Sequence, residues 1–419
     1  MDISKTDAKV CVRVQKAAST TTRVTTWRAE SSHVLELATH LIEEKVSLVV
    51  MEATGDYWKP FYYLLGGEGL NVMLVNARQV RQIPGRKTDV ADAVWLADLG
   101  AHGLVHGSFV PPPEIRELKD LVRARVTLVR LRGQEAQRLE KLLESAAVKL
   151  SATISDITGA TGRRMLEALI EGSLDPTQIA GLAGRRMKAS REQLTEALTG
   201  RFTEHHGFLA RLHLDMIDNY TTRIGELDAR IDAYFDPAVT GSSRVPAEVR
   251  EDLSTKRELL ATIPGIATTT AERIIAEIGH DMSAFPTARH LTSWAGIAPG
   301  ANESAGKVKS TRCRPGNTYL KGALGTAALV ASRAEDTFLA ARYRRIAARR
   351  GHMRALVALQ RTILVAIWNA MTTGQPYTDL GGDYYIQRRP GPTITKAIRQ
   401  LQAAGVNITL TSPTTAVVT

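Results

Sequence analysis

Four acidic residues near the start of the chain stand where carboxylates can carry out chemistry. Asp2 precedes a β-rich segment, and Glu52 directly follows the apolar run SLVVM. Asp89 and Asp92 lie three residues apart on a predicted helix, so they share a face. Acids at strand ends and on such a helix can converge at the carboxyl edge of an α/β sheet. Crowded carboxylates repel one another and supply the hard oxygen ligands that Mg²⁺ prefers, and a Mg²⁺ pair can clamp the attacking and leaving oxygens of a phosphodiester.

The same acids also have structural interpretations. By spacing alone, Asp89 can be a helix N-cap and Asp92 a solvated acid of the first turn. Glu52 is harder to explain in this way, because a Glu that closes a buried strand needs a partner. Two further acids are set aside: Asp56 is interpreted as a helix start and Asp98 as a surface residue.

Strands and helices alternate around these acids. Short β-rich runs and continuous apolar runs predict strands, and spacings of three and four predict helices, the first of them capped by Ser31. The expected order over 1–110 is β-β-β-α-β-α-β-α. The strands are predicted at 1–3, 9–14, 22–27, 47–51 and 71–75, and the helices at 31–45, 56–65 and 89–99.

The rest of the chain reads as mainly helical. Prolines at 111–113 mark a boundary, and two long amphipathic helices over 114–144 and 204–234 flank a helical insert at 150–200. These helices are expected to pair as a coiled coil, with each other or across a dimer. A polar link is expected at 241–250, a helix–turn–helix at 259–279, a loop-rich segment at 286–325, basic helices at 336–372 and a partly mobile tail with weak β-type runs. The domains are therefore 1–110, 111–240, 241–372 and 373–419.

Composition excludes several classes of protein. The 419 residues are 44% hydrophobic and 23% charged, which are values typical of globular chains. No apolar run of about 18 residues predicts a transmembrane helix, and the first residues do not resemble a secretory signal. The only cysteines, Cys11 and Cys313, exclude a disulfide scaffold and a CxxC zinc site. A reducing, cytoplasmic setting is expected.

Positive charge is concentrated in one segment. Between Gly306 and Arg361 there are thirteen Lys and Arg against two Asp and Glu, which equals the net excess of +11 for the whole chain. Ten of these thirteen residues are Arg, the side chain favoured for bidentate contact with phosphates and bases. A nucleic-acid partner is the leading interpretation, and a merely basic surface is the alternative.

Several motifs resemble those of the IS110 insertion-sequence family, which includes the Piv-type DNA invertases. They are DISK, MEATGDYW and GRKTDVADAVWLADL in the first part, and IPGIATTTAERIIAEIG, LTSWAGIAPGANESAGKVKS and RPGNTYLKGAL in the second. The resemblance covers about 1–110 and 255–370 in the family's order. It implies the fold class α/β plus α: an RNase H-like (RuvC-like) domain, long coiled-coil helices and a mainly helical transposase domain.

The resemblance also implies a reaction. Asp2, Glu52, Asp89 and Asp92 would bind Mg²⁺, with Mn²⁺ as a substitute, and Ser304 would form a covalent phosphoserine link to DNA. Family members are similar to recombinases that excise and insert their element under the guidance of a bridge RNA. The implied partners are donor DNA, target DNA, that RNA and further copies of the chain, as a dimer or tetramer whose protomers could share an active site. A prokaryotic, nucleoid-associated location in the cytoplasm follows, without a membrane.

Other residues are candidates for contacts with nucleic acid. By spacing alone Ser310, Ser293 and Thr311 rival Ser304 as nucleophile. The Pro264–Gly265 turn resembles a helix-hairpin-helix or is an ordinary helix corner, and Tyr319 stacks on a base or packs in the core. His102 and His106 are interpreted as structural. A close backbone approach to DNA is expected at Gly316–Asn317. The predicted nucleic-acid-binding residues are Arg86, Lys87, Lys307, Lys309, Arg312, Arg314, Asn317 and Lys321.

One departure from the family pattern and several rival functions stay open. Only Met1 precedes Asp2, so either the true start lies upstream or the first strand is unusually short. A Holliday-junction nuclease would use the same acids with water as nucleophile, and a Piv-like invertase would need no guide RNA. A sugar-kinase-like phosphotransferase would need ATP-loop glycines, which are not found. A non-catalytic nucleic-acid-binding protein would show no metal dependence.

Overall fold

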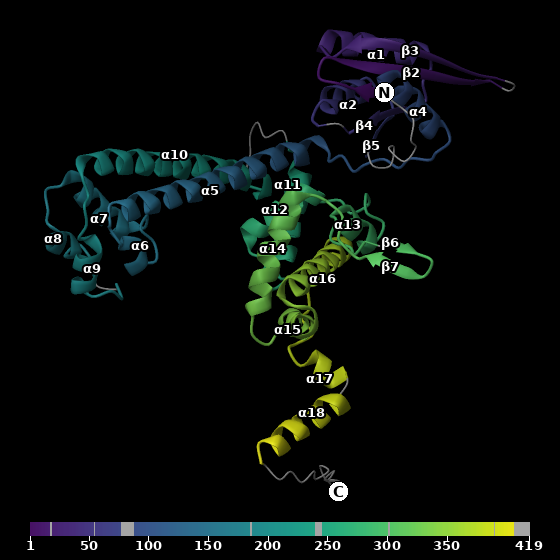
Figure 1. Ribbon diagram of the computed structural model, residues 1–419. Helices are drawn as coiled ribbons and strands as arrows, with labels where there is room; N and C mark the ends of the chain where they lie inside the picture. The colour runs from purple at the N-terminus through teal and green to yellow at the C-terminus, as the bar shows by residue number, and fades with distance from the viewer. Residues whose placement is uncertain are drawn as a thin grey trace, which may run out of the picture. The chain divides into compact units, whose positions relative to one another are not determined.

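The computed structural model describes residues 1–16, 19–53, 55–76, 88–184, 187–238, 245–300, 302–388 and 390–405. The chain divides into two compact units, Met1–Pro111 and Pro112–Thr419 (Figure 1). The division falls within the proline run at 111–113, where the fixed φ of proline interrupts regular structure. Each unit is described below by itself.

The first unit has the expected order of elements. Strands β1 (Asp2–Ile3), β2 (Asp7–Lys16) and β3 (Ser19–Arg28) form an antiparallel sheet, and β4 (Val49–Glu52) pairs in parallel with β5 (Val72–Val75). The helices are α1 (Ser31–Glu43), α2 (Trp58–Gly67) and α4 (Asp89–Ala101). The α/β character of this unit is confirmed, while its RNase H-like classification stays a prediction. Ser31 is not the cap of α1 as expected; it is the first helical residue, and the N-cap position is Glu30.

Alternation along the strands separates two apolar cores. Met1, Ile3, Val49 and Met51 belong to a core with side chains of α1 and α2. Val50 belongs instead to a second core with Leu96 and Leu99 of α4. Because successive residues of a strand point to opposite faces, α1 and α2 cover one face of the β4 region and α4 covers the other.

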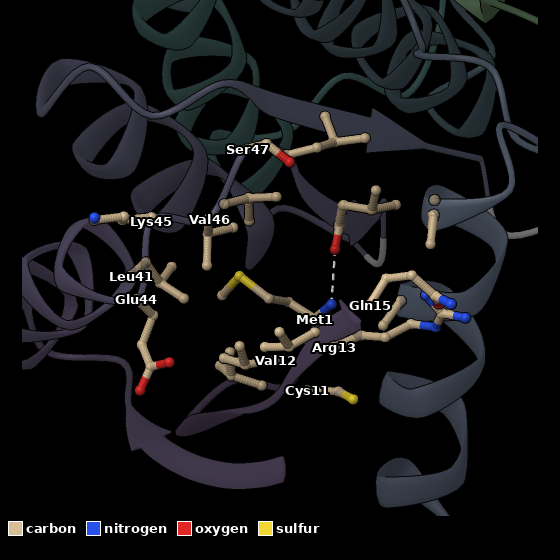
Figure 2. A pocket seen from close by; sticks show the side chains of 18 residues that line it. Met1, Cys11, Val12, Arg13, Gln15, Leu41, Glu44, Lys45, Val46 and Ser47 are labelled. Atoms are coloured by element: carbon tan, nitrogen blue, oxygen red, sulfur yellow. Dashed lines mark hydrogen bonds between the residues drawn. The ribbon is translucent and has the colours of Figure 1, made fainter. Parts of the chain in front are cut away.

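The first strand is very short, and a cavity of about 480 Å³ lies beside it. On one side the cavity is lined by residues 10–15 of β2, and on another by residues 46–50, which include the start of β4. Figure 2 shows Met1 among these side chains, with its amino nitrogen donating to the Val50 carbonyl oxygen at 2.7 Å. Residues of β2 and of the segment leading into β4 therefore line one space, and the amino group of Met1 is hydrogen-bonded beside it.

Two long helices open the second unit. Helices α5 (Pro113–Ser145) and α10 (Glu204–Phe235) lie side by side within one chain (Figure 1). An ion pair between Arg125 and Asp228 joins them, and His213 Nδ1 lies 3.0 Å from Glu135 Oε2. Pairing within the chain is thus one of the two expected arrangements, and a coiled-coil geometry stays a prediction. The insert holds α6 (Leu150–Thr153), α7 (Ala160–Glu171), α8 (Pro176–Ala180) and α9 (Arg191–Leu198).

The remainder of this unit is also helical, with one hairpin. Its elements are α11 (Ala247–Ala261), α12 (Thr268–Ile278), α13 (Ala288–Trp294), β6 (Asn302–Ser304), β7 (Lys307–Ser310), α14 (Thr318–Arg333), α15 (Phe338–Arg350), α16 (His352–Thr373), α17 (Tyr384–Arg388) and α18 (Pro390–Ala403).

One expectation for this region was wrong, since residues 247–250 belong to α11 and not to a polar link, with Pro246 at the N-cap position. The segment 286–325 holds α13, the β6–β7 hairpin and the start of α14, joined by loops. The described part of the tail forms α17 and α18, and the β-prone residues after 405 lie outside the described residues.

Helix α16 is long and apolar enough to cross a membrane by length and composition, with a mean hydropathy of 1.3 over its most apolar stretch. Its apolar face packs against α13, α14 and α15, with Leu359, Ile363 and Ile367 fully buried. Of that apolar stretch 39% is buried, and Arg354 and Arg361 lie on the exposed face of the helix.

Candidate functional site

Strand alternation places two of the four acids toward helix α4. Asp2 lies between Met1 and Ile3, which point into the α1/α2 core, so Asp2 points to the opposite face. Glu52 lies two residues after Val50 on β4, so its side chain points to the same face as that of Val50, which packs with α4. Asp89 and Asp92 occupy the first turn of α4, where Thr88 is the N-cap and accepts a hydrogen bond from Ala91 N at 3.3 Å. Asp89 is therefore not the cap, and the four acids of the first unit share one face.

The other three acids act electrostatically on Asp2. Burial raises the pKa of Asp2, and the negative charges of Asp89, Glu52 and Asp92 raise it further. All three of the other predicted ligands thus act on this one carboxyl group. Such mutual repulsion is costly unless a cation compensates for it.

The four carboxylates are of the ligand type that a divalent metal prefers, but their arrangement is not a complete ligand shell. Within the described ranges, no three His, Cys, Asp or Glu side chains lie close enough together to hold a metal ion. Asp2, Glu52 and Asp92 are half-buried and Asp89 is exposed, so solvent reaches the site. A hard cation that keeps several of its waters, as Mg²⁺ does, suits such an open set of oxygens.

Ser304 lies at the end of an exposed hairpin in the second unit. It is the last residue of β6 and pairs with Lys307, the first residue of β7. The turn between them is Ala305–Gly306, with φ of 51° and 73°. Two consecutive positive φ values are required by the tight hairpin turn of type I′, which usually uses Asn-Gly. The Ser304 hydroxyl is thus held at a sharply turned, solvent-exposed tip.

Exposure does not separate Ser304 from its rivals, because Ser293, Ser310 and Thr311 are exposed as well. Ser293 lies near the end of α13, and Ser310 Oγ accepts a hydrogen bond from Arg312 N at 3.2 Å. The position at the tip of the hairpin distinguishes Ser304. Sequence reasoning missed this hairpin; the Ala-Gly dipeptide between short polar runs was its signal.

The predicted basic contacts fall into three groups. Lys307, Lys309, Arg312 and Arg314 are exposed on or just after the hairpin. Lys321 Nζ donates to the Arg314 carbonyl oxygen at 2.9 Å. Arg86 and Lys87 lie outside the described residues. Contact of these residues with nucleic acid stays a prediction.

Asn317 has structural partners. Its Oδ1 accepts from Tyr319 N at 3.1 Å and Leu320 N at 3.0 Å, which caps α14, and its Nδ2 donates to Glu277 Oε2. The ring of Tyr319 is covered by the Arg123 guanidinium, whose Cζ lies 4.3 Å from the ring centroid. Packing is therefore the role that the structure gives to Tyr319.

Glu277 is a residue that sequence reasoning missed. It is 1% exposed and accepts hydrogen bonds from Arg123 Nε at 2.7 Å and Nη2 at 2.9 Å, while Lys119 Nζ lies 3.5 Å away. Burial alone would raise the pKa of Glu277, but these cations and Asn317 outweigh it and lower the pKa. Glu277 connects α5 and α12 with the N-terminus of α14. This N-terminus directly follows the segment that carries Arg312 and Arg314.

Two glycines have close contacts within the chain. A Cβ at Gly316 would lie 2.2 Å from the Ala295 carbonyl oxygen, so packing within the chain already requires a glycine there, and an approach of DNA to this backbone stays a prediction. Gly265 has φ +90°, and a Cβ on it would lie 2.3 Å from the Ala327 carbonyl oxygen of α14. Packing against α14 thus explains the glycine of the Pro264–Gly265 turn.

The remaining candidates have ordinary surroundings. His102 Nδ1 lies 2.8 Å from the Asp98 carbonyl oxygen. Asp98 is more than a surface acid, since its Oδ1 accepts from Arg13 Nε at 2.8 Å. Asp56 lies in the turn before α2 with its side chain 82% exposed.

Comparisons with known proteins agree with these features. Residues 1–147 match the family model of the DEDD transposases of IS110, and residues 257–344 match that of the IS116/IS110/IS902 transposase family. The insertion element IS110 uncharacterized 43.6 kDa protein of Streptomyces coelicolor is 24% identical over 314 residues, 70% of this chain and 73% of its own length.

Pilin gene-inverting proteins also match. Those of Moraxella bovis and Moraxella lacunata are each 37% identical over 83 residues, which is 19% of this chain and 26% of theirs. The two family models together cover both the acids of the first unit and the Ser304 hairpin of the second. The chain therefore belongs to the IS110 family of transposases, which are site-specific DNA recombinases.

Proposed function

We propose that the protein cleaves and rejoins DNA strands, with Mg²⁺ at the four acids and a covalent phosphoserine at Ser304, to excise and insert a mobile element. The observation that carries this proposal is that Asp2 and Glu52 point to the face covered by α4, whose first turn holds Asp89 and Asp92. The charges of Asp89, Glu52 and Asp92 accordingly add to burial in raising the pKa of Asp2. A face that crowds four carboxylates is expensive to fold and is useful when a divalent cation neutralises it.

The chemistry follows from the groups present. When bound, Mg²⁺ supplies charge neutralisation at the scissile phosphate and lowers the proton affinity of a nearby hydroxyl. Ser304 Oγ forms a bond to phosphorus, the bond from phosphorus to the leaving DNA oxygen breaks, and the seryl proton passes to solvent. The leaving oxygen is protonated in turn. Attack of a second DNA hydroxyl on the phosphoserine reverses these changes and releases the rejoined strand, so no external energy source is required.

Guidance by a bridge RNA, assembly as a dimer or tetramer, and action at the prokaryotic nucleoid belong to the same proposal. The basic segment 306–361 supports a polyanionic partner, and the exposed Lys307, Lys309, Arg312 and Arg314 place positive charge beside Ser304. Because Ser304 and the acids belong to different units, protomers can combine the two halves of a site in an oligomer.

The test is a denaturing-gel assay for protein linked to labelled DNA. We expect Ser304→Ala to abolish the linked species, and Ser310→Ala, at an exposed serine of the same hairpin, to retain it. Asp89→Ala should abolish strand cleavage while leaving nucleic-acid binding largely intact, whereas Asp56→Ala should cleave normally. A linked species in the Ser304→Ala protein would refute the nucleophile assignment.

A Piv-like invertase without a guide RNA is the second candidate, favoured by the similarity to the pilin gene-inverting proteins. Both candidates form the covalent link, so sequencing the nucleic acid that co-purifies with the protein separates them: a discrete structured RNA supports the guided recombinase. Cleavage without any linked species would instead indicate a nuclease that uses water.

A further inference from the structure

A large cleft lies at the base of the β6–β7 hairpin in the second unit. Its volume is about 1090 Å³, slightly above the ~300–1,000 Å³ of typical ligand sites. One wall is the segment from Ser310, the last residue of β7, to Cys313. The other wall is one face of α16, with Arg354, Val357 and Arg361 at helical spacing.

The cleft carries positive charge without a counter-charge. Four arginines line it, and none of its lining residues is Asp or Glu. In the part of the chain that the structure describes, these arginines form no ion pair with an acidic side chain. Arg342 Nη1 donates to Tyr385 Oη at 3.1 Å, while its Nε is buried without a hydrogen-bond partner among the described residues. The four arginines are Arg312, Arg342, Arg354 and Arg361.

The floor of the cleft is apolar. Val357 and Val365 of α16 are half-exposed there, and Met353 is 69% exposed at its rim. Ile297 and Pro299 contribute from the loop that follows α13. An apolar floor between unpaired arginines fits a ligand that has both flat apolar faces and negative charges.

We propose that this cleft binds an unpaired DNA strand next to the phosphate that Ser304 attacks. Bases would lie on the Val357 and Val365 surface, and phosphates would pair with the arginines. Duplex DNA does not match this floor, because its base faces are stacked inside the helix, whereas a single strand offers them. The choice of DNA as the ligand rests on the proposed function. The location near Ser304 does not, since the cleft begins where β7 of the Ser304 hairpin ends.

Binding is tested with RNA-free full-length protein and fluorescein-labelled oligothymidylate of about 12 nucleotides, a length within the range of known single-strand sites. We expect the double variant Arg354→Gln/Arg361→Gln to bind about tenfold more weakly and to reduce the salt slope by roughly 1.4, at about 0.7 for each lost phosphate contact. The matched control is Arg344→Gln/Arg349→Gln, which removes the same charge from exposed positions of α15 outside the cleft.

A second variant tests the apolar floor. Val357→Asp should weaken single-strand binding at least as strongly, and Val357→Leu should retain it. Circular dichroism of both variants checks that α16 stays helical. Duplex of matched sequence should bind all Val357 variants equally.

Cys313 supplies a readout that does not depend on activity. It is half-exposed in the cleft, and Cys11 is half-exposed in the first unit. Oligothymidylate should slow alkylation of Cys313 by iodoacetamide severalfold and leave alkylation of Cys11 unchanged, as measured by peptide mass spectrometry. A Ser304→Ala protein should show the same protection, so the cleft can be correct even where the nucleophile assignment fails.

The proposal is overturned by any of three results. The cleft variants bind oligothymidylate as the control does; Cys313 is not protected; or an RNA oligomer of the same length protects Cys313 at lower concentration than DNA, which would assign the cleft to RNA.

Discussion

The residue after the candidate nucleophile has an unfavourable backbone conformation. Ala305 has φ of 51°, a region that costs an L-residue with a Cβ roughly 1–2 kcal/mol. Asn tolerates this region, and Asn-Gly is the preferred dipeptide of the type I′ turn. The sequence therefore places Ala, and not the best turn residue, directly beside Ser304.

We expect Ala305→Asn to stabilise the hairpin by about 1 kcal/mol, which corresponds to roughly fivefold slower hydrogen exchange of its amides. Ala305→Val should have the opposite effect, because a β-branched side chain is strongly disfavoured at positive φ. Exchange of the peptide spanning 302–310 measures both. Equal exchange in the two variants would show that the turn is not formed in solution.

Two glutamates of α12 provide a matched pair. Glu277 has its pKa lowered, since Arg123, Lys119 and Asn317 outweigh its burial, whereas burial raises the pKa of Glu272 despite Arg257. A carboxyl group with a lowered folded-state pKa stabilises the fold above its unfolded-state pKa, and this contribution is lost as the pH falls through the folded value. A carboxyl group with a raised folded-state pKa instead destabilises the fold above its unfolded-state pKa.

We expect Glu277→Gln to destabilise the second unit by about 3 kcal/mol at pH 7, because it leaves Arg123 and Lys119 without their buried partner. The difference from the parent protein should shrink below about pH 4.5, the ordinary value for Glu, as Glu277 of the parent becomes protonated. Glu272→Gln should cost much less. Urea unfolding at several pH values measures both, and an equal cost for the two variants would contradict the assignment.

At the scale of elements, the sequence predicted the acids better than the hairpin. Asp2, Glu52, Asp89 and Asp92 could be placed because strand alternation and helical spacing are local patterns. That they share a face follows from the packing of α4 against β1 and β4, which the sequence does not show. The β6–β7 hairpin and the role of Glu277 could not be predicted, since short polar strands carry little periodicity and Arg123 is 154 positions from Glu277.

The space beside β1 leads to an element-scale prediction. The ammonium group of Met1 is buried, and burial lowers its pKa from 8.0 to about 6. The unfolded chain takes up this proton first as the pH falls, so stability is lost between pH 8 and 6, by roughly 2.7 kcal/mol at 1.36 kcal/mol per pKa unit.

An extension of about four β-prone residues before Met1 should replace the ammonium group with an amide and pair with the facing edges of β2 and the segment before β4. We expect thermal unfolding of the first unit to lose its dependence on pH between 6 and 8 and its Tm to rise at pH 8 as well. A Gly-Ser extension is the control: it should remove the pH dependence without the second gain. Equal Tm values for the two extensions would show that no strand forms in the cavity.

Over the whole molecule, the excess of positive charge and the four candidate acids fall in different units. The four acids lie in the unit Met1–Pro111, whereas the segment that equals the entire net excess of +11 lies in the unit Pro112–Thr419. Each unit has its own apolar core.

This separation predicts a local response to metal. In the full-length protein without DNA, Mg²⁺ should slow hydrogen exchange in β1, β4 and the first turn of α4, and should leave α12, α14 and α16 unchanged. Protonation competes with the metal at Asp2, whose pKa is raised by burial and by Asp89, Glu52 and Asp92, so the protection should weaken as the pH falls through that raised value. Asp89→Ala should lose the protection, and Asp56→Ala should keep it. Equal protection of both units, or protection that survives in Asp89→Ala, would place the metal elsewhere and remove the four acids as its ligands.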